Sequence, residues 1–206
     1  MIITSRIPKG KTRCTITTDG GESFTVSVRD ARLYGLEEGA EISASVLSLI
    51  REQLRKEILH ESGILLGGRD YTEKRLTEKL LERDYPEDLV QEAVQSLKEA
   101  RYLDDRRFAR SYIRSHIQDR SRLRIIRDLA GKGISETDIE EVFAEFAEEE
   151  DLEDAQRQQV MRLLKKRGFD PGEAGYEERQ KTMAFLHRKG YPADLIRRMT
   201  GGRDDY

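Results

Sequence analysis

Arginine side chains gather in the middle of this 206-residue chain. Between residues 106 and 132 the sequence has eight arginines and one lysine, against two acidic residues, Asp119 and Asp128. Clustered guanidinium groups bind phosphates or carboxylates, and the binding energy falls as salt rises. The candidate residues for binding a partner or a nucleic acid are Arg106, Arg107, Arg110, Arg114, Arg120, Arg122, Arg124, Arg127 and Lys132.

A second interpretation of this cluster remains open, because an acidic strip follows it. Residues 136–154 contain eleven acidic residues and no lysine or arginine. If these carboxylates belong to neighbouring helices, they could neutralise the arginines on a solvated surface. Within the strip, residues 148–151 are expected to form a solvated turn; the alternative is a surface that mimics or repels nucleic acid, or meets a basic partner. The arginines at 120, 122, 124 and 127 cannot share one helical face, so some must face solvent or a partner.

Catalysis and metal binding have no support in the residue pattern. Glycine loops of the phosphate-binding types do not occur in the sequence, and no serine is paired with a histidine in a nucleophile motif. His60, His116 and His187 are far apart and lack cysteines or paired acids at ligand spacing. We therefore expect a protein that is not an enzyme and that has no catalytic residue, metal ligand or cofactor.

Three short helices are predicted to carry the arginines and the acidic strip. The first begins at Asp104 or Asp105. The second ends at Gly131 or Gly133, where glycine can adopt the left-handed conformation, and Ser135 begins the third. Each has an apolar face at helical spacing. These faces consist of Phe108, Ala109, Tyr112, Ile113 and Ile117; of Ile125, Ile126, Leu129 and Ala130; and of Ile139, Val142, Phe143 and Phe146.

The turn between the second and third of these helices recurs on both sides. The pattern Leu129-x-x-x-Gly133-Ile134-Ser135 is matched by Leu80-x-x-x-Asp84-Tyr85-Pro86 and by Leu186-x-x-x-Gly190-Tyr191-Pro192. A period near fifty residues is typical of repeat proteins, in which each unit buries its apolar face against its neighbours. The sequence predicts a tandem array of three three-helix repeats at residues 45–101, 102–149 and 150–206.

The first 44 residues differ from the rest. Residues 13–18 and 23–28 are rich in β-formers and flank Asp19-Gly20-Gly21, which predicts a β-hairpin. Because so small a β module is not stable alone, we expect it to pack on the apolar face of the following helix, formed by Val46, Leu47, Ile50, Leu54 and Ile58. The predicted fold class is mainly α, with a small N-terminal β-hairpin extension.

The cysteine content and the hydropathy of the chain indicate the cellular compartment in which we expect the protein. The single cysteine, Cys14, cannot form an intramolecular disulfide and is expected to be a small buried residue in a strand. No segment approaches the roughly 20 apolar residues of a membrane span, and the first residues lack a signal-peptide pattern. We expect a cytoplasmic protein that does not associate with membranes.

The quoted motifs resemble a known family. Tyr102-Leu-Asp-Asp-x-x-Phe108-Ala-x-x-Tyr112-Ile113, followed by Leu129-x-x-Lys132-Gly133-Ile134, is similar to the central repeat of RecX, the bacterial regulator of the recombinase RecA. Thr72-x-x-x-Leu76-x-x-Lys79-Leu80 resembles its first repeat, and the N-terminal motif Asp19-Gly20-x-x-x-Phe24-x-Val26 resembles a β extension of some members. The family often has a glycine where this chain has Ser121, and an acid where it has Arg75.

The resemblance implies a regulator that binds the RecA filament on single-stranded DNA and inhibits ATP hydrolysis and strand exchange, by filling the filament groove or by blocking filament growth. We expect a monomer, with single-stranded or double-stranded DNA as a further partner. The alternative is a helix-turn-helix-like DNA-binding protein without a recombinase partner, because each repeat contains a helix, a turn and a second helix. A helical scaffold with no nucleic-acid context is a third hypothesis.

Overall fold

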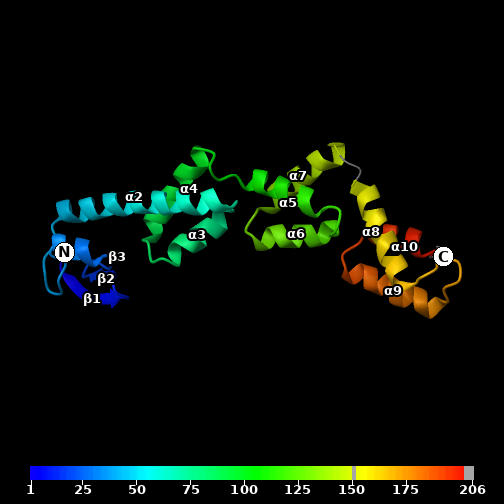
Figure 1. Ribbon diagram of the computed structural model, residues 1–206, viewed down its shortest axis with the longest axis horizontal. Helices are drawn as coiled ribbons and strands as arrows, with labels where there is room; N and C mark the ends of the chain where they lie inside the picture. The colour runs from blue at the N-terminus through cyan, green and yellow to red at the C-terminus, as the bar shows by residue number, and fades with distance from the viewer. Residues whose placement is uncertain (150–151, 202–206) are drawn as a thin grey trace. The chain divides into compact units, whose positions relative to one another are not determined.

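The computed structural model describes residues 1–149 and 152–201, although the side chains of residues 147–149 lie outside that description. The chain divides into two compact units, residues 1–104 and the residues from Asp105 onward. The first unit holds a three-stranded antiparallel sheet, and helices make up most of both units (Figure 1). The predicted fold class, a mainly α array with a small N-terminal β element, is confirmed.

The sheet contains the predicted hairpin and one additional strand. Its strands are β1 (Ile3–Lys9), β2 (Arg13–Thr18) and β3 (Ser23–Ser27), in the order β1-β2-β3. Gly21, at φ 80°, lies in the β2–β3 turn, and Cys14 is buried on β2 as expected. The hairpin's second strand ends one residue early, because Ser27 accepts a hydrogen bond from the backbone N–H of Asp30 and so begins helix α1 (Val28–Leu33).

The sheet and the first repeat share one hydrophobic core. The helices of this repeat are α2 (Ala44–Gly68), α3 (Glu73–Leu81) and α4 (Glu87–Glu99). Ile50, Leu54 and Ile58 are buried along α2 and belong to the same core as Ile3 and Ile16 of the sheet. The sheet lies beside the N-terminal half of α2, with α3 and α4 beside its C-terminal half (Figure 1). The predicted packing of the β extension on this helix is confirmed.

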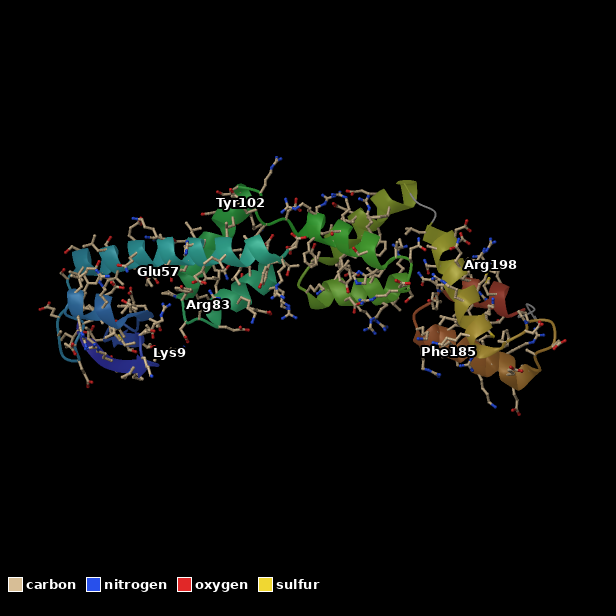
Figure 2. The ribbon with its side chains drawn as sticks, in the orientation of Figure 1. Lys9, Glu57, Arg83, Tyr102, Phe185 and Arg198 are labelled. Carbon is tan, nitrogen blue, oxygen red and sulfur yellow. The ribbon has the colours of Figure 1, made fainter. Side chains whose placement is uncertain are left out.

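Ion pairs join the sheet to the repeat. Lys9 of β1 pairs with Asp84 in the α3–α4 turn, and Arg13 of β2 lies 3.8 Å from the carboxylate of Glu57 on α2. Arg13 also lies over the ring of Tyr85, 5.4 Å from its centroid. Figure 2 shows Lys9 on the same side of α2 as Arg83, the residue that precedes Asp84. The extension therefore contacts both the long helix and the turn of the first repeat.

The second unit holds six helices within its described residues. They are α5 (Asp105–His116), α6 (Arg122–Gly131), α7 (Glu136–Glu149), α8 (Leu152–Arg167), α9 (Tyr176–Arg188) and α10 (Ala193–Thr200). One core lies among α5, α6 and α7, and a second lies among α8, α9 and α10. Phe143 and Phe146 are fully buried as predicted, whereas Phe108 and Tyr112 lie half-buried at the edge of their core. Residues 148 and 149 of the expected acidic turn instead belong to the end of α7; their side chains, and residues 150 and 151, lie outside the described residues.

The recurring sequence pattern forms a left-handed turn in each repeat. Asp84, Gly133 and Gly190 have φ values of 58°, 92° and 86°. The residue after each of them, Tyr85, Ile134 or Tyr191, is buried. The backbone N–H groups of Ile134 and Tyr191 donate to the carbonyls of the leucines five residues earlier, at 3.3 Å in both cases, as in Schellman-type helix ends. Conformation and burial thus explain the matching residue types.

The helix starts also follow the sequence. Thr72 caps α3 by accepting a hydrogen bond from the backbone N–H of Arg75. Pro86 lies one residue before α4, and Pro192 occupies the equivalent position before α10. No helix in the described ranges is both long enough and apolar enough to span a membrane.

Candidate functional site

Two of the predicted binding residues are neutralised by the acidic strip. Arg106 lies 2.9 Å from the carboxylate of Glu141 and 3.1 Å from that of Glu145, and Arg110 also pairs with Glu145. The hydrogen bond and charge of Arg110 lower the pKa of Glu145 below its usual value. For these two arginines, the interpretation as a solvated and neutralised helix surface fits the structure.

Three other cations of the cluster lie over aromatic rings of the second repeat. Arg114 lies 5.7 Å from the centre of the Phe146 ring, and Arg122 lies 4.9 Å from that of Phe143. Lys132 lies near both Phe108 and Tyr112, at 5.8 and 5.4 Å from their ring centres. These cation–π contacts hold the three cations against the aromatic rings of the second repeat. Of the remaining candidates, Arg107 is exposed on α5.

Asp128 is the centre of a polar cluster at the side of α6. Its carboxylate accepts hydrogen bonds from Arg120 at 2.7 Å, from Arg124 at 3.1 Å and from the hydroxyl of Tyr112 at 3.3 Å. The ring of Tyr112 also stacks on His116, with centroids 4.1 Å apart. Burial opposes ionisation of Asp128, but the hydrogen bond from Arg120 and the charge of Arg124 prevail and lower its pKa. Asp128 therefore keeps its negative charge beside the two arginines.

A groove of about 610 Å³ lies between the second and third repeats, and cations line it. Arg120, Arg124 and Arg127 come from the predicted cluster. Arg162, Arg188 and Lys189 come from the third repeat, and Asp119 is the acid in the lining. We call this surface the basic groove. It gathers side chains that are almost seventy residues apart in the sequence.

Buried hydrogen bonds form the floor of the basic groove. Gln159 of α8 donates from Nε2 to the backbone carbonyls of Ile117 and Arg120, and its Oε1 accepts from the hydroxyl of Tyr191 at 2.9 Å. Ser121 donates to the carbonyl of Lys189 at 2.6 Å. Gln159, Tyr191 and Ser121 are all less than a tenth exposed. Because their polar atoms are paired, this floor fixes the third repeat against the second.

Gly190 allows this close approach. A Cβ atom built there would lie 3.0 Å from the Cβ of Leu123 and 3.0 Å from the Oγ of Ser121. Its φ of 86° also belongs to the left-handed region that favours glycine. A side chain at this position would separate the two repeats at the floor of the groove.

The predicted binding residues did not include the cations that the third repeat contributes to the basic groove. Arg162 follows the acidic strip, and Arg188 and Lys189 directly precede the repeated Gly-Tyr-Pro turn. The contact of that turn with Ser121 could have identified these residues, because it places Arg188 and Lys189 beside the start of α6. The sequence alone does not show which turn meets which helix.

Within the described ranges, no group of three or more histidine, cysteine, aspartate or glutamate side chains could hold a metal ion. A second depression, of about 470 Å³, lies between α8 and α10. Its arginines are paired: Arg198, labelled in Figure 2, contacts Glu153 at 2.6 Å, and Arg157 lies 3.7 Å from Asp154. The basic groove therefore remains the stronger candidate for a binding site.

Tandem three-helix units and a cationic groove define a helical repeat protein with a surface suited to anionic partners. Models of the first, second and third three-helix domains of RecX match residues 65–97, 104–142 and 148–199. A regulatory protein RecX from Trichlorobacter lovleyi is 34% identical over 140 residues, which are 66% of this chain and 88% of that protein. The chain belongs to the RecX family.

Two further comparisons extend the match along the chain. A regulatory protein RecX from Oceanobacillus iheyensis is 28% identical over 189 residues, which cover 87% of this chain and 66% of the relative. A crystal structure of regulatory protein RecX superimposes with a TM-score of 0.65 at 22% identity, covering 98% of this chain and 99% of that one. At 22% identity, this structural match shows that the two chains share a fold.

Proposed function

We propose that this chain is a non-enzymatic regulator of RecA. It binds the RecA filament on single-stranded DNA and limits ATP hydrolysis, filament growth and strand exchange, acting as a monomer in the cytoplasm. The observation that carries this proposal is the match of three successive segments to the three RecX domains, together with relatives named regulatory protein RecX.

The physical properties of the chain suit such a role. Tandem repeats present a series of similar surfaces, so one molecule can contact several protomers of a filament. The candidate residues are the cations of the basic groove, whereas Arg106 and Arg110 are held by Glu145. Because charged groups contribute much of the contact, association should weaken as salt rises.

A second function, direct DNA binding without a recombinase, is favoured by one observation. The basic groove has six cations and a single acid in its lining, and phosphate groups are the natural ligands of such a surface. DNA binding alone would require no contact with RecA. The two functions therefore predict different results when RecA is absent.

The test is a titration of the protein into RecA that is hydrolysing ATP on single-stranded DNA, with binding to bare DNA recorded at the same salt. The proposal expects inhibition at fewer than one molecule per RecA protomer, with weak binding to bare DNA. Unchanged ATP hydrolysis together with tight binding to bare DNA would select the second function. Unchanged ATP hydrolysis without DNA binding would contradict both.

A further inference from the structure

The charge of the basic groove is only partly neutralised by the protein. Arg120 and Arg124 share Asp128, and Arg162 donates to the carbonyl of Gln118 and lies 4.0 Å from Asp119. Among the described residues, the side chains of Arg127 and Arg188 have no hydrogen bond or ion pair. Arginines held close together without counter-ions repel one another, so an anion entering the groove would relieve an existing cost.

The start of α6 adds to this positive charge. Ser121, at its N-cap, lines the groove, and the first turn has Arg122 and Arg124 but no acidic residue. All other helices of this unit have an acidic residue in the first turn, within the described ranges. Cations at a helix N-terminus are opposed by the positive end of the helix dipole. A local arrangement that works against stability is expected where function requires it.

The lining of the groove indicates which part of a partner it contacts. Leu163 is its large aliphatic side chain, and its aromatic residue, Tyr191, is buried with its hydroxyl bonded to Gln159. The groove thus offers no exposed ring for base stacking and no apolar pocket for a hydrophobic anchor from a protein. Stacking rings are typical of single-strand readers, and apolar anchors of protein interfaces. Polar, strongly positive surfaces are typical of contacts with phosphates.

From these observations we infer that the basic groove binds the phosphate backbone of a nucleic acid without reading its bases, and that Asp128 is a built-in competing anion that limits the affinity. The carboxylate of Asp128 occupies the guanidinium groups of Arg120 and Arg124, which a phosphate would otherwise engage. This inference deepens the proposed function. It rests on that function only for the choice of single-stranded DNA as the nucleic acid.

The test measures binding of the full chain to a fluorescently labelled single-stranded oligonucleotide in the absence of RecA, by anisotropy at several salt concentrations. Arg127→Ala with Arg188→Ala should reduce the slope of log affinity against log salt by about 1.4, because each phosphate contact on a single strand contributes about 0.7. The same relation predicts an affinity loss of roughly 25-fold at about 0.1 M salt.

Lys166→Ala with Arg197→Ala is the matched control. Both residues are exposed in the same unit and lie outside the groove lining, and their removal changes the net charge by the same amount. This pair should lower the affinity much less. Equal losses for the two pairs would show that net charge alone attracts the oligonucleotide, and the assignment to the groove would be wrong.

Asp128→Asn should change the affinity in the opposite direction, raising it several-fold, because Arg120 and Arg124 then become available to phosphate. Circular dichroism establishes whether this variant is folded. Asp119→Asn provides a second measurement with little risk to folding, since the Asp119 side chain is 77% exposed at the groove. If Asp128→Asn is folded and does not bind more tightly, Asp128 is not a competitor; if Asp119→Asn also fails to raise the affinity, phosphate does not enter the groove.

Two competitors of the labelled oligonucleotide distinguish phosphate from carboxylate as the ligand of the groove. An oligonucleotide with an uncharged methylphosphonate backbone should not compete, and poly-glutamate should compete much less well than DNA. Equal competition by poly-glutamate would reassign the groove to carboxylates of a protein partner. Inhibition of RecA that persists when the groove variants lose DNA binding would leave the proposed function intact and refute only the role of this groove within it.

Discussion

Ser121 donates a hydrogen bond to the backbone carbonyl of Lys189 at 2.6 Å, across the junction of the second and third repeats. The same oxygen accepts a hydrogen bond from the backbone N–H of Arg124 at 3.3 Å and so caps α6. One hydroxyl therefore begins a helix and holds the turn of the next repeat beside it. A glycine at this position could do neither.

Replacing Gly190 with alanine should separate this junction. The added Cβ would meet Ser121 and Leu123 at 3.0 Å, in a backbone conformation that alanine rarely adopts. We expect the free energy of unfolding to fall by about 1–3 kcal/mol, measured by urea denaturation. Gly131→Ala is the control: a Cβ there meets nothing within 4 Å, at the end of α6, so this variant should be unchanged or slightly more stable.

Tyr191→Phe should leave Gln159 with an unpaired oxygen beneath the groove. The Tyr191 hydroxyl donates to that oxygen at 2.9 Å, and burial raises the pKa of Tyr191, which keeps the hydroxyl protonated as a donor. A buried acceptor without a donor costs about 1–3 kcal/mol, so thermal or urea denaturation should show a loss of that size. A variant as stable as the original chain would mean that water replaces the hydroxyl.

The two phenylalanines of the second repeat should differ in their cost of removal. Phe143 is 1% exposed at the centre of the core, so Phe143→Ala should lower the free energy of unfolding by about 3–5 kcal/mol. Phe108 is half-buried beside Lys132, and Phe108→Ala should cost roughly half as much. Equal losses, compared by urea denaturation, would place Phe108 in the centre of the core as well.

Acid should weaken the second repeat through Asp128 and Glu145. Both carboxyl groups have lowered pKa values in the folded chain: hydrogen bonding by Arg110 lowers that of Glu145, while for Asp128 the effect of Arg120 and Arg124 outweighs burial. The stability they contribute is therefore complete above their unfolded values of 3.8 and 4.5, and is lost as pH falls through the lower folded values.

Urea denaturation from neutral pH to about pH 3 measures this loss. Asp128→Asn, which cannot titrate, should lose less stability across that interval than the original chain. If the two acid profiles are parallel, the ion pairs of Asp128 contribute nothing to folding.

Local rules in the sequence predicted the helices well, because their signals come from neighbouring residues. The apolar spacing placed Ile139, Val142 and Phe143 in the core, and the Leu-x-x-x-Gly pattern located the left-handed turns. Strand β1 was missed because its pattern is not that of a half-buried strand: Ile3 is buried, but Ile7 is 60% exposed and Pro8 follows it. Pairing with β2, a non-local interaction, makes this segment a strand.

The binding residues were harder to predict, because proximity in sequence does not determine which charges remain available. The predicted cluster contained Arg106 and Arg110, which Glu145 holds from thirty-five and more residues away. It lacked Arg188, which reaches the same groove as Arg127 only because Gly190 packs against Ser121. The role of these residues in binding stays a prediction.

The core shared by the sheet and the first repeat has a consequence for assembly. The end of a helical array normally exposes an apolar face on which a further repeat, or another copy, could stack. Here Ile3, Ile16 and Phe24 of the sheet lie in one core with Ile50 and Leu54 of α2. The β extension thus covers the part of the apolar face of α2 on which a further repeat could otherwise stack.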